Sequence, residues 1–109
     1  MNEMSYTGWD IGGAHLKVAR VNTQGQLDFA GQYPTPIWQG IDVLEEVFPK
    51  VLHQLDNSSN LHAVTMTAEL VDIFDNRQQG IQQLVDLSEQ TLGKNICFYT
   101  YENGFLDSD

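Results

Sequence analysis

A short segment near the N-terminus has the residue types of a polyphosphate site: Asp10, Gly12, Gly13 and Lys17. Glycines let backbone N–H groups approach phosphate oxygens, the lysine neutralises charge, and the aspartate can hold a hydrated Mg²⁺ ion. Strand-like sequence on both sides predicts that this segment is the turn of a β-hairpin. The same residues also suit a tight turn that only exposes an acid, so the segment alone leaves both interpretations open.

Histidine adds one candidate to this turn. His15 belongs to the turn itself and can donate a hydrogen bond to phosphate. The other two histidines, His53 and His62, fall on an expected helix and an expected strand, and the three have no metal-ligand spacing. A zinc site built by the protein is therefore not expected.

The charge balance is strongly acidic. Fifteen acidic residues against five basic ones give a net charge of −10, and two of the five bases, Lys17 and Arg20, lie beside the glycine turn. A field of this sign repels nucleic acid and anionic lipid, so neither is expected as a partner. It also disfavours an anionic ligand unless a metal ion or a helix terminus neutralises the charge locally. The phosphate interpretation therefore depends more strongly on Mg²⁺.

The length of 109 residues predicts a single domain over residues 1–109. No stretch approaches the ~20 apolar residues of a membrane span, and the acidic N-terminal residues do not resemble a signal peptide. The single cysteine, Cys97, excludes an internal disulfide and fits a reducing compartment. These features predict a cytoplasmic protein that does not bind a membrane.

The first third of the chain predicts three strands. Residues 7–10 and 16–22 flank the glycine turn, and residues 27–33 alternate with Leu27, Phe29, Gly31 and Tyr33 on one face. The connection at residues 22–25, Asn-Thr-Gln-Gly, has the composition of a turn. Tight connections between successive strands predict an antiparallel meander.

An irregular segment and a helix follow. Residues 34–40 contain two prolines and predict an extended loop without helix. Apolar residues then recur at helical spacing from Ile41 to Leu55. Pro49 lies inside this pattern and predicts a kink or a break after Phe48. The acids of this helix, Asp42, Glu45 and Glu46, are expected on its solvated face.

The last third predicts a strand, a helix and a strand. Leu61–Met66 reads as a compact buried strand. A second helix is expected to begin at a cap formed by Asp75 or Asn76 and to stop at Gly93. Residues 95–101 are rich in strand-forming residues.

Three further expectations concern individual side chains and the C-terminal tail. Trp9 and Trp38 are expected to pack against the protein, although stacking of Trp38 on an aromatic substrate stays open. Cys97 is expected to be a small buried residue. The acidic tail, residues 102–109, is expected to fray.

The predicted order of elements is β-β-β-α-β-α-β. A meander followed by strand-helix-strand crossovers gives a mixed five-stranded sheet with helices packed on it. This α/β arrangement is the half-domain of ribonuclease-H-like proteins and actin-like ATPases, in which the turn between the first two strands is a phosphate loop. The segment from Asp10 to Lys17 occupies that position, so motif and topology support each other.

Three segments in order resemble one family. Residues 8–17 (Gly-Trp-Asp-Ile-Gly-Gly-Ala-His-Leu-Lys), 36–40 (Pro-Ile-Trp-Gln-Gly) and 64–72 (Val-Thr-Met-Thr-Ala-Glu-Leu-Val-Asp) resemble the N-terminal part of hydantoinase-A/oxoprolinase-like proteins. The most similar group belongs to a tetrahydromethanopterin-linked one-carbon-transfer pathway. The resemblance implies a synthase of methanofuran or methylofuran biosynthesis, which joins an aminomethylfuran diphosphate to a tyramine-derived phenol and releases pyrophosphate.

The implied chemistry needs two groups of residues. Asp10, Gly12, Gly13 and Lys17 fit the pyrophosphate and its Mg²⁺ by position, and ATP or a diphosphate is the expected ligand. Thr65 and Thr67 are expected to contact phosphate. Glu69 is the candidate general base for the phenol or a second metal contact. A glutamate near a helix start is also stabilised by the helix dipole without any chemistry.

The chain matches only the first half of such proteins. The resemblance implies a site between two half-domains, so this chain is expected to be inactive without its partner half. An ATP-dependent kinase or hydrolase of the same superfamily, or a non-catalytic docking module, remain the alternatives. Apolar residues of the last strand and of residues 34–40 are expected to be uncovered, which favours self-association.

Overall fold

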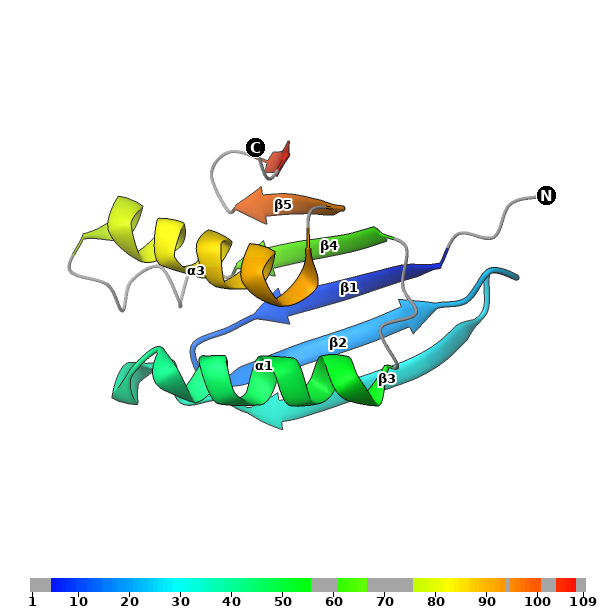
Figure 1. Ribbon diagram of the computed structural model, residues 1–109, viewed down its shortest axis with the longest axis horizontal. Coiled ribbons are helices and arrows are strands. Elements are labelled where there is room, and N and C mark those ends of the chain that lie inside the picture. Colours follow the sequence, from blue (N-terminus) through cyan, green and yellow to red (C-terminus); the bar gives the residue numbers. More distant parts are fainter. Residues whose placement is uncertain (1–4, 56–60, 67–75, 94, 101–103, 108–109) are drawn as a thin grey trace.

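The computed structural model describes residues 5–55, 61–66, 76–93, 95–100 and 104–107, which form one mixed sheet and two α-helices (Figure 1). The sheet has six strands in the order β3-β2-β1-β4-β5-β6. The strands are β1 (Tyr6–Ile11), β2 (His15–Val21), β3 (Leu27–Pro34), β4 (Leu61–Met66), β5 (Ile96–Thr100) and β6 (Gly104–Asp107). The helices are α1 (Asp42–Gln54) and α3 (Arg77–Leu92), and η1 (Ile37–Gln39) is one short 3₁₀ turn.

The predicted order of elements and the five expected strands are confirmed. The expectation that the tail frays is wrong for Gly104–Asp107, because this segment forms β6 and pairs antiparallel with β5. Pairing there gives the edge of β5 the backbone partners that an edge strand otherwise lacks. The sheet therefore has one strand more than the five expected.

The N-terminal meander has a turn stabilised by one side chain. Asn22 Oδ1 accepts hydrogen bonds from the N–H groups of Gln24 and Gln26, over 2.9 and 3.0 Å. Gly25 has a φ of 81°, in the left-handed region that suits glycine. These contacts fix the β2–β3 connection at the point where the sequence composition predicts a turn.

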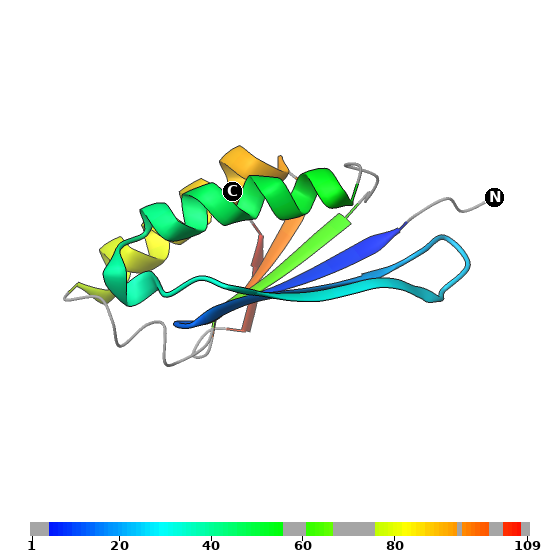
Figure 2. The ribbon, with the colours of Figure 1, turned by 90° about the horizontal axis from the view of Figure 1, so that it is seen from below.

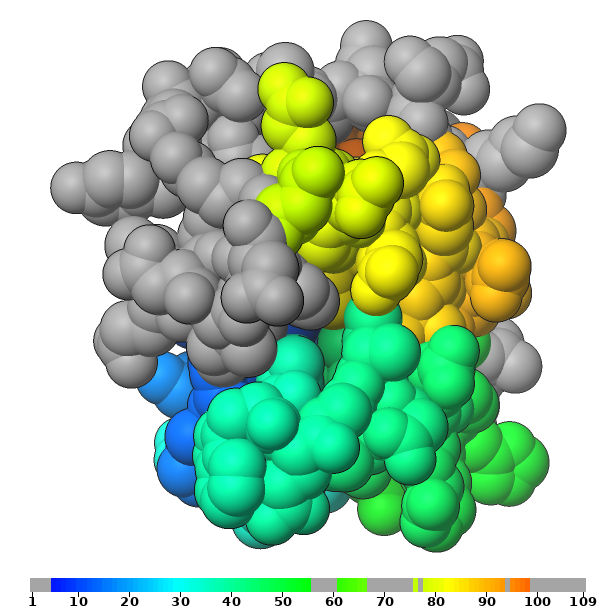
Figure 3. All heavy atoms as spheres, turned by 90° about the vertical axis from the view of Figure 1, so that its left-hand side faces the viewer, coloured from blue at the N-terminus to red at the C-terminus, as the bar shows by residue number. Residues whose placement is uncertain are grey.

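Both helices lie on one face of the sheet (Figure 2). β1, β4 and β5 are parallel neighbours, and α1 and α3 lie in the connections that join them in sequence. Figure 3, which views the molecule from one end, shows the two helices side by side. None of the helices in the described ranges is long and apolar enough to cross a membrane.

The core lies between the sheet and the helices. Trp9, 1% exposed, packs its ring against Phe48 of α1 with a centroid distance of 4.8 Å. Its indole Nε1 donates a hydrogen bond to Nδ1 of buried His62, over 3.0 Å. Burying Trp9 and Phe48 stabilises the fold by about 2–3 kcal/mol for each side chain. The expected packing of Trp9 is confirmed, and the exposure of Asp42, Glu45 and Glu46 on α1 matches the predicted solvated face.

Of the kink or break expected after Phe48, the break is wrong, because α1 continues through Pro49 to Gln54. Proline has no N–H to donate to the carbonyl of Glu45, one turn earlier. Pro49 and Glu45 both lie on the exposed side of the helix, where water can solvate that carbonyl. Leu44, Phe48 and Val51 are buried on the opposite side and hold the helix against the sheet.

Residues 34–40 are not wholly extended, since Ile37–Gln39 form the 3₁₀ turn η1. Pro36 precedes the turn, where its missing N–H is not needed. Ile37 is buried, whereas Trp38 is 65% exposed. The expectation that Trp38 is a packing anchor is therefore wrong, because the single turn directs Ile37 into the core instead.

The second helix has the ends that the sequence indicates. The Asn76 side chain accepts a hydrogen bond from the N–H of Gln79 over 3.1 Å, so Asn76 is the N-cap of α3. Gly93 ends the helix with a φ of 91°. Cys97 on β5 is half-buried rather than fully buried, because it alternates with the core residues Ile96 and Phe98 and so lies on the sheet face opposite the helices.

Candidate phosphate site on the open face of the sheet

The candidate site is centred on Asp10, which lies near the C-terminal end of β1. Asp10 is directly opposite Lys17 on antiparallel β2 and beside Thr65 on parallel β4. Residues opposite one another in a pleated sheet project from the same face. The two flanking residues of Asp10, Trp9 and Ile11, are buried toward the helices. Asp10, Lys17 and Thr65 thus share the open face.

Thr65 fixes the position of the Asp10 carboxylate. The Thr65 hydroxyl lies 3.2 Å from Asp10 Oδ1 and 3.4 Å from the Trp9 carbonyl oxygen. A hydroxyl has one proton, so it shares that proton between the two acceptors or alternates between them. Thr65 lies beside Asp10 in the register of β1 and β4. Its observed contact is to Asp10, and contact with phosphate stays a prediction.

A shallow hollow of about 320 Å³ lies beside these three polar residues. Its remaining lining is mostly small or backbone: Gly8, Trp9, Val18, Ala19 and Ala63. Gly8 pairs with Ala19 on one side and with Ala63 on the other, which forms a row of small residues next to the polar row. The hollow therefore joins a flat apolar floor to a carboxylate, an ammonium and a hydroxyl.

Lys17 supplies the positive charge of the site. The ion pairs between described residues are Arg20–Asp28 and Lys50–Glu46, and Lys17 belongs to neither. Its side chain is exposed on the open face, opposite Asp10. An ammonium held in this position can interact with an anionic ligand without first breaking an internal ion pair.

The glycine turn offers fewer amide donors than its sequence suggests. Gly12 N–H donates to the carbonyl of His15 over 3.0 Å, so this amide is already engaged. Within the described ranges, the N–H groups of Gly13 and Ala14 have no acceptor. Neither Gly12 nor Gly13 has a positive φ, so the turn does not need glycine for a left-handed backbone at either position. Phosphate binding at both glycines stays a prediction, with Gly13 as the amide donor.

Residues 35–37 bind this turn through two backbone hydrogen bonds. Thr35 N–H donates to the carbonyl of Ala14 over 2.8 Å, and Ile37 N–H donates to the carbonyl of Gly13 over 3.1 Å. Both carbonyls of the turn are thus directed toward this segment. Thr35 is fully buried, and among the described residues its hydroxyl has no hydrogen-bond partner. Thr35 lies between Pro34 and Pro36, and nothing in this local sequence indicates that its backbone N–H binds the glycine turn.

Of the three remaining candidate site residues, the structure describes His15 but not Thr67 or Glu69. His15 starts β2 and is half-buried, two residues before Lys17 and on the same face of the strand. Thr67 and Glu69 lie outside the described residues, so their roles as phosphate contact and general base stay predictions.

A magnesium ion would have Asp10 as its main protein ligand. The described residues contain no cluster of three or more His, Cys, Asp or Glu side chains that could form an all-protein metal site. Mg²⁺ commonly keeps several waters and binds through one or two carboxylates together with substrate phosphates. One anchored carboxylate beside the glycine turn fits that ligand set.

The sequence is similar to that of a curated synthase. It is 26% identical over 102 residues to (4-{4-[2-(gamma-L-glutamylamino)ethyl]phenoxymethyl}furan-2-yl)methanamine synthase from Methanocaldococcus jannaschii. The match covers 94% of this chain and 29% of that synthase. No protein-family model matches the sequence, so membership of the hydantoinase-A/oxoprolinase-like group stays a prediction.

Similar folds occur in solved structures of phosphatases and of RuvC. An exopolyphosphatase from Cytophaga hutchinsonii aligns with a TM-score of 0.63 at 13% identity, over 89% of this chain and 34% of its own. The Aquifex aeolicus Ppx/GppA phosphatase has a TM-score of 0.57 at 14% identity, over 91% of this chain and 36% of its own.

RuvC from T. thermophilus aligns with a TM-score of 0.56 at 18% identity, over 90% of this chain and 64% of its own. At these identities the alignments establish architecture. The chain spans about a third of the two phosphatases and 29% of the curated synthase. It has the ribonuclease-H-like, actin-like ATPase fold, with Asp10, Lys17 and Thr65 side by side on its open sheet face.

Proposed function

We propose that this chain is the N-terminal, phosphate-binding half of a synthase in methanofuran- or methylofuran-type cofactor biosynthesis, which serves tetrahydromethanopterin-linked one-carbon metabolism. The observation that carries the proposal is the match to the M. jannaschii synthase over 94% of this chain. The name of that synthase describes a furan joined through a methylene to a phenol oxygen. The arrangement of Asp10, Lys17 and Thr65 supports a phosphate-bearing precursor of that methylene.

The proposed reaction forms one carbon–oxygen bond and breaks another. The phenol oxygen attacks the furan-bound CH₂ group, and the bond from that carbon to the diphosphate oxygen breaks. Pyrophosphate leaves with the electron pair, and the phenolic proton passes to a general base. A phenol has a pKa of about 10, so a base near its oxygen is needed at neutral pH.

The described residues are suited to the leaving group. Lys17 and the N–H groups of Gly13 and Ala14 would bind diphosphate oxygens, with His15 as a further donor. Asp10 would hold the hydrated Mg²⁺, and the hydrogen bond from Thr65 would keep its carboxylate oriented. When bound, Mg²⁺ would neutralise charge that develops on the departing pyrophosphate. Gly12 would shape the turn, since its amide is engaged with His15.

The attacking phenol and its base require residues beyond this set. Glu69 remains the candidate base, and Thr67 a candidate phosphate contact. The open face around Asp10 is shallow, and a reacting carbon needs a site from which water is excluded. We therefore propose that a partner half closes over this face and that the 109-residue chain is inactive without it.

An ATP-dependent kinase or hydrolase of the same fold is the second candidate. The phosphatase neighbours favour it only through shared architecture. The two candidates differ in the ligand that the glycine turn should prefer, which is a free diphosphate for the synthase and a nucleotide for the kinase or hydrolase. A non-catalytic docking module would prefer neither.

The test is calorimetric titration of pyrophosphate and of ATP into the purified chain, each in the presence and in the absence of Mg²⁺. Asp10→Asn and Lys17→Ala should abolish the heat of binding. Asp42→Asn and Lys50→Ala remove the same side-chain charges from the exposed face of α1 and should leave it unchanged. A preference for pyrophosphate supports the synthase. Equal binding by all four variants would refute the site.

A further inference from the structure

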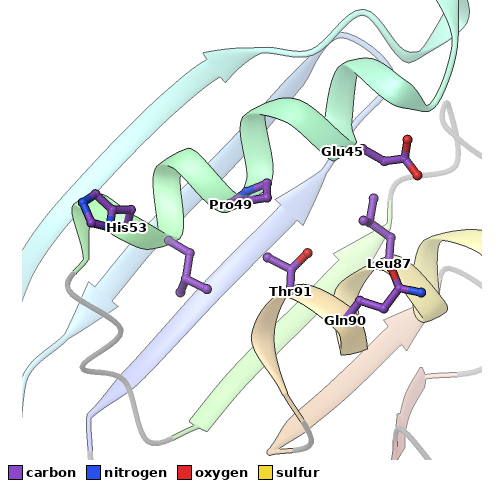
Figure 4. A pocket seen from close by; sticks show the side chains of 7 residues that line it. Glu45, Pro49, His53, Leu87, Gln90 and Thr91 are labelled. Carbon is purple, nitrogen blue, oxygen red and sulfur yellow. The ribbon is translucent and has the colours of Figure 1, made fainter.

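The two helices leave a groove between them on the covered side of the sheet (Figure 4). Its main part has a volume of about 480 Å³ and continues into a second hollow of about 280 Å³. The two parts share Glu45, Leu87 and Gln90, so they form one channel along α1 and α3. We call this channel the interhelix groove. It lies on the opposite side of the sheet from Asp10.

The floor of the interhelix groove is apolar. Leu87 of α3 is 8% exposed, Leu52 of α1 is half-buried, and Pro49 presents its ring to the groove. Polar side chains surround this small apolar area on both helices. A helix that lies in a groove uses apolar residues at positions i, i+3, i+4 and i+7.

The rim of the interhelix groove is acidic. Glu45 and Asp86 are exposed on its two sides, one on each helix. The residues that line both hollows include no lysine or arginine. The nearest lysine in sequence, Lys50, forms its ion pair with Glu46 over 3.3 Å. The basic residues of an occupant would be attracted to the carboxylates of Glu45 and Asp86.

A backbone acceptor adds to this polarity. Pro49 cannot donate to the carbonyl of Glu45, and both residues line the groove. Lysine and arginine side chains supply donors that can reach such a carbonyl. The floor, the rim and the backbone thus require the same chemistry of an occupant: an apolar stripe with cationic donors on either side.

We propose that the interhelix groove binds a basic amphipathic helix of a different protein. A second copy of this chain matches the acidic rim poorly, because α1 contains one basic residue, Lys50, apart from His53, and α3 contains only Arg77. The partner helix would place an apolar stripe on Leu52 and Leu87, and its lysines or arginines beside Glu45 and Asp86. This surface is independent of the phosphate site.

The probe is an acetylated helical peptide of leucine and lysine, with leucine at i, i+3, i+4 and i+7, titrated into the chain and followed by fluorescence anisotropy. Saturable binding is expected. Glu45→Gln/Asp86→Asn should weaken binding by about tenfold or more. The matched variant Asp42→Asn/Glu46→Gln removes two charges outside the groove lining and should change binding by less than about twofold.

Four outcomes would overturn the proposal. The absence of saturable binding would refute it directly. Equal losses in the two double variants would show that the net charge of −10 attracts the peptide without a site. Equal binding of a leucine–glutamate peptide would show that the rim charges do not select a basic helix. Sedimentation that shows a dimer lost on Leu52→Lys would assign the groove to a second copy instead.

Discussion

The hydroxyl of Thr65 lies 3.2 Å from Oδ1 of Asp10 and so joins the ends of two adjacent parallel strands, β1 and β4. It also lies 3.4 Å from the carbonyl of Trp9, one residue before Asp10. The carboxylate that would hold Mg²⁺ is thereby restrained from a neighbouring strand as well as from its own backbone. Positioning by a second hydrogen-bonding group is how ligating carboxylates are commonly oriented.

Thr65→Val tests this restraint. Valine has the shape of threonine and suits a strand, so the free energy of unfolding should change by less than about 1 kcal/mol. Affinity for Mg²⁺–pyrophosphate should fall about threefold to tenfold, because Asp10 loses its orienting donor. Calorimetry and urea unfolding measure the two effects. Thr65→Ser retains the hydroxyl and should bind as the parent does, whereas an equal loss in both variants would contradict the role.

Arg20 links three elements and should be more important for stability than its ion-pair partner. Its Nε donates to Asp28 Oδ1 over 2.9 Å, and one terminal nitrogen donates to the carbonyl of Leu55, after the end of α1, over 2.8 Å. Arg20→Ala should lower the free energy of unfolding by about 2 kcal/mol. Asp28→Ala keeps the bond to Leu55 and should cost about 1 kcal/mol or less. Urea unfolding that ranks the two in reverse would contradict this.

His62 should make stability depend on pH. Burial lowers the pKa of His62 below its ordinary value of 6.5, and its Nδ1 accepts the Trp9 N–H bond only while neutral. As pH falls below about 6.5, the unfolded chain binds a proton that the folded chain does not. Stability should therefore decrease on acidification, with a limiting slope of about 1.4 kcal/mol per pH unit.

The comparison is between urea unfolding at pH 7.5 and at pH 5.5, above the range in which most carboxylates titrate. His62→Asn offers an acceptor that does not titrate and should lose most of this dependence. His53→Gln changes an exposed histidine and should retain it. A pH dependence that is the same in both variants would assign the effect to other groups.

Pro49→Ala should stabilise the chain. The substitution restores the N–H that bonds the Glu45 carbonyl and removes a residue that disfavours a helix interior by about 3 kcal/mol relative to alanine. Because α1 already accommodates the proline on its exposed side, a gain of about 1–2 kcal/mol is expected in urea unfolding. A loss of stability would mean that the proline ring contributes packing that outweighs the missing bond.

Local sequence predicts most of this fold because its signals agree. Leu61–Met66 is found as predicted, and Asn76 and Gly93 bound α3 where cap chemistry places them. The expectations that were wrong concern features that depend on tertiary contacts. The apolar side of α1 holds the helix together through Pro49, and β6 forms because the neighbouring edge of β5 offers backbone partners. No short segment of sequence contains either piece of information.

Part of the candidate site is predictable, because the order of the strands determines which residues become neighbours. Adjacency of Asp10 and Lys17 follows from the hairpin, and adjacency of Asp10 and Thr65 follows from the parallel crossover. The small-residue floor beside them depends on the pairing of Gly8 with Ala19 and Ala63, which only the register reveals. The engaged amide of Gly12 likewise depends on how the turn closes.

The most direct test of the central claim is a titration of the ¹⁵N-labelled chain with Mg²⁺–pyrophosphate, followed by backbone amide shifts in NMR. Saturable shifts should be largest at Gly13, Ala14 and Lys17, smaller at Gly12, and absent from the interhelix groove around Leu87. Asp10→Asn should abolish them. Shifts centred elsewhere, or none that saturate, would contradict a phosphate site at the β1–β2 turn.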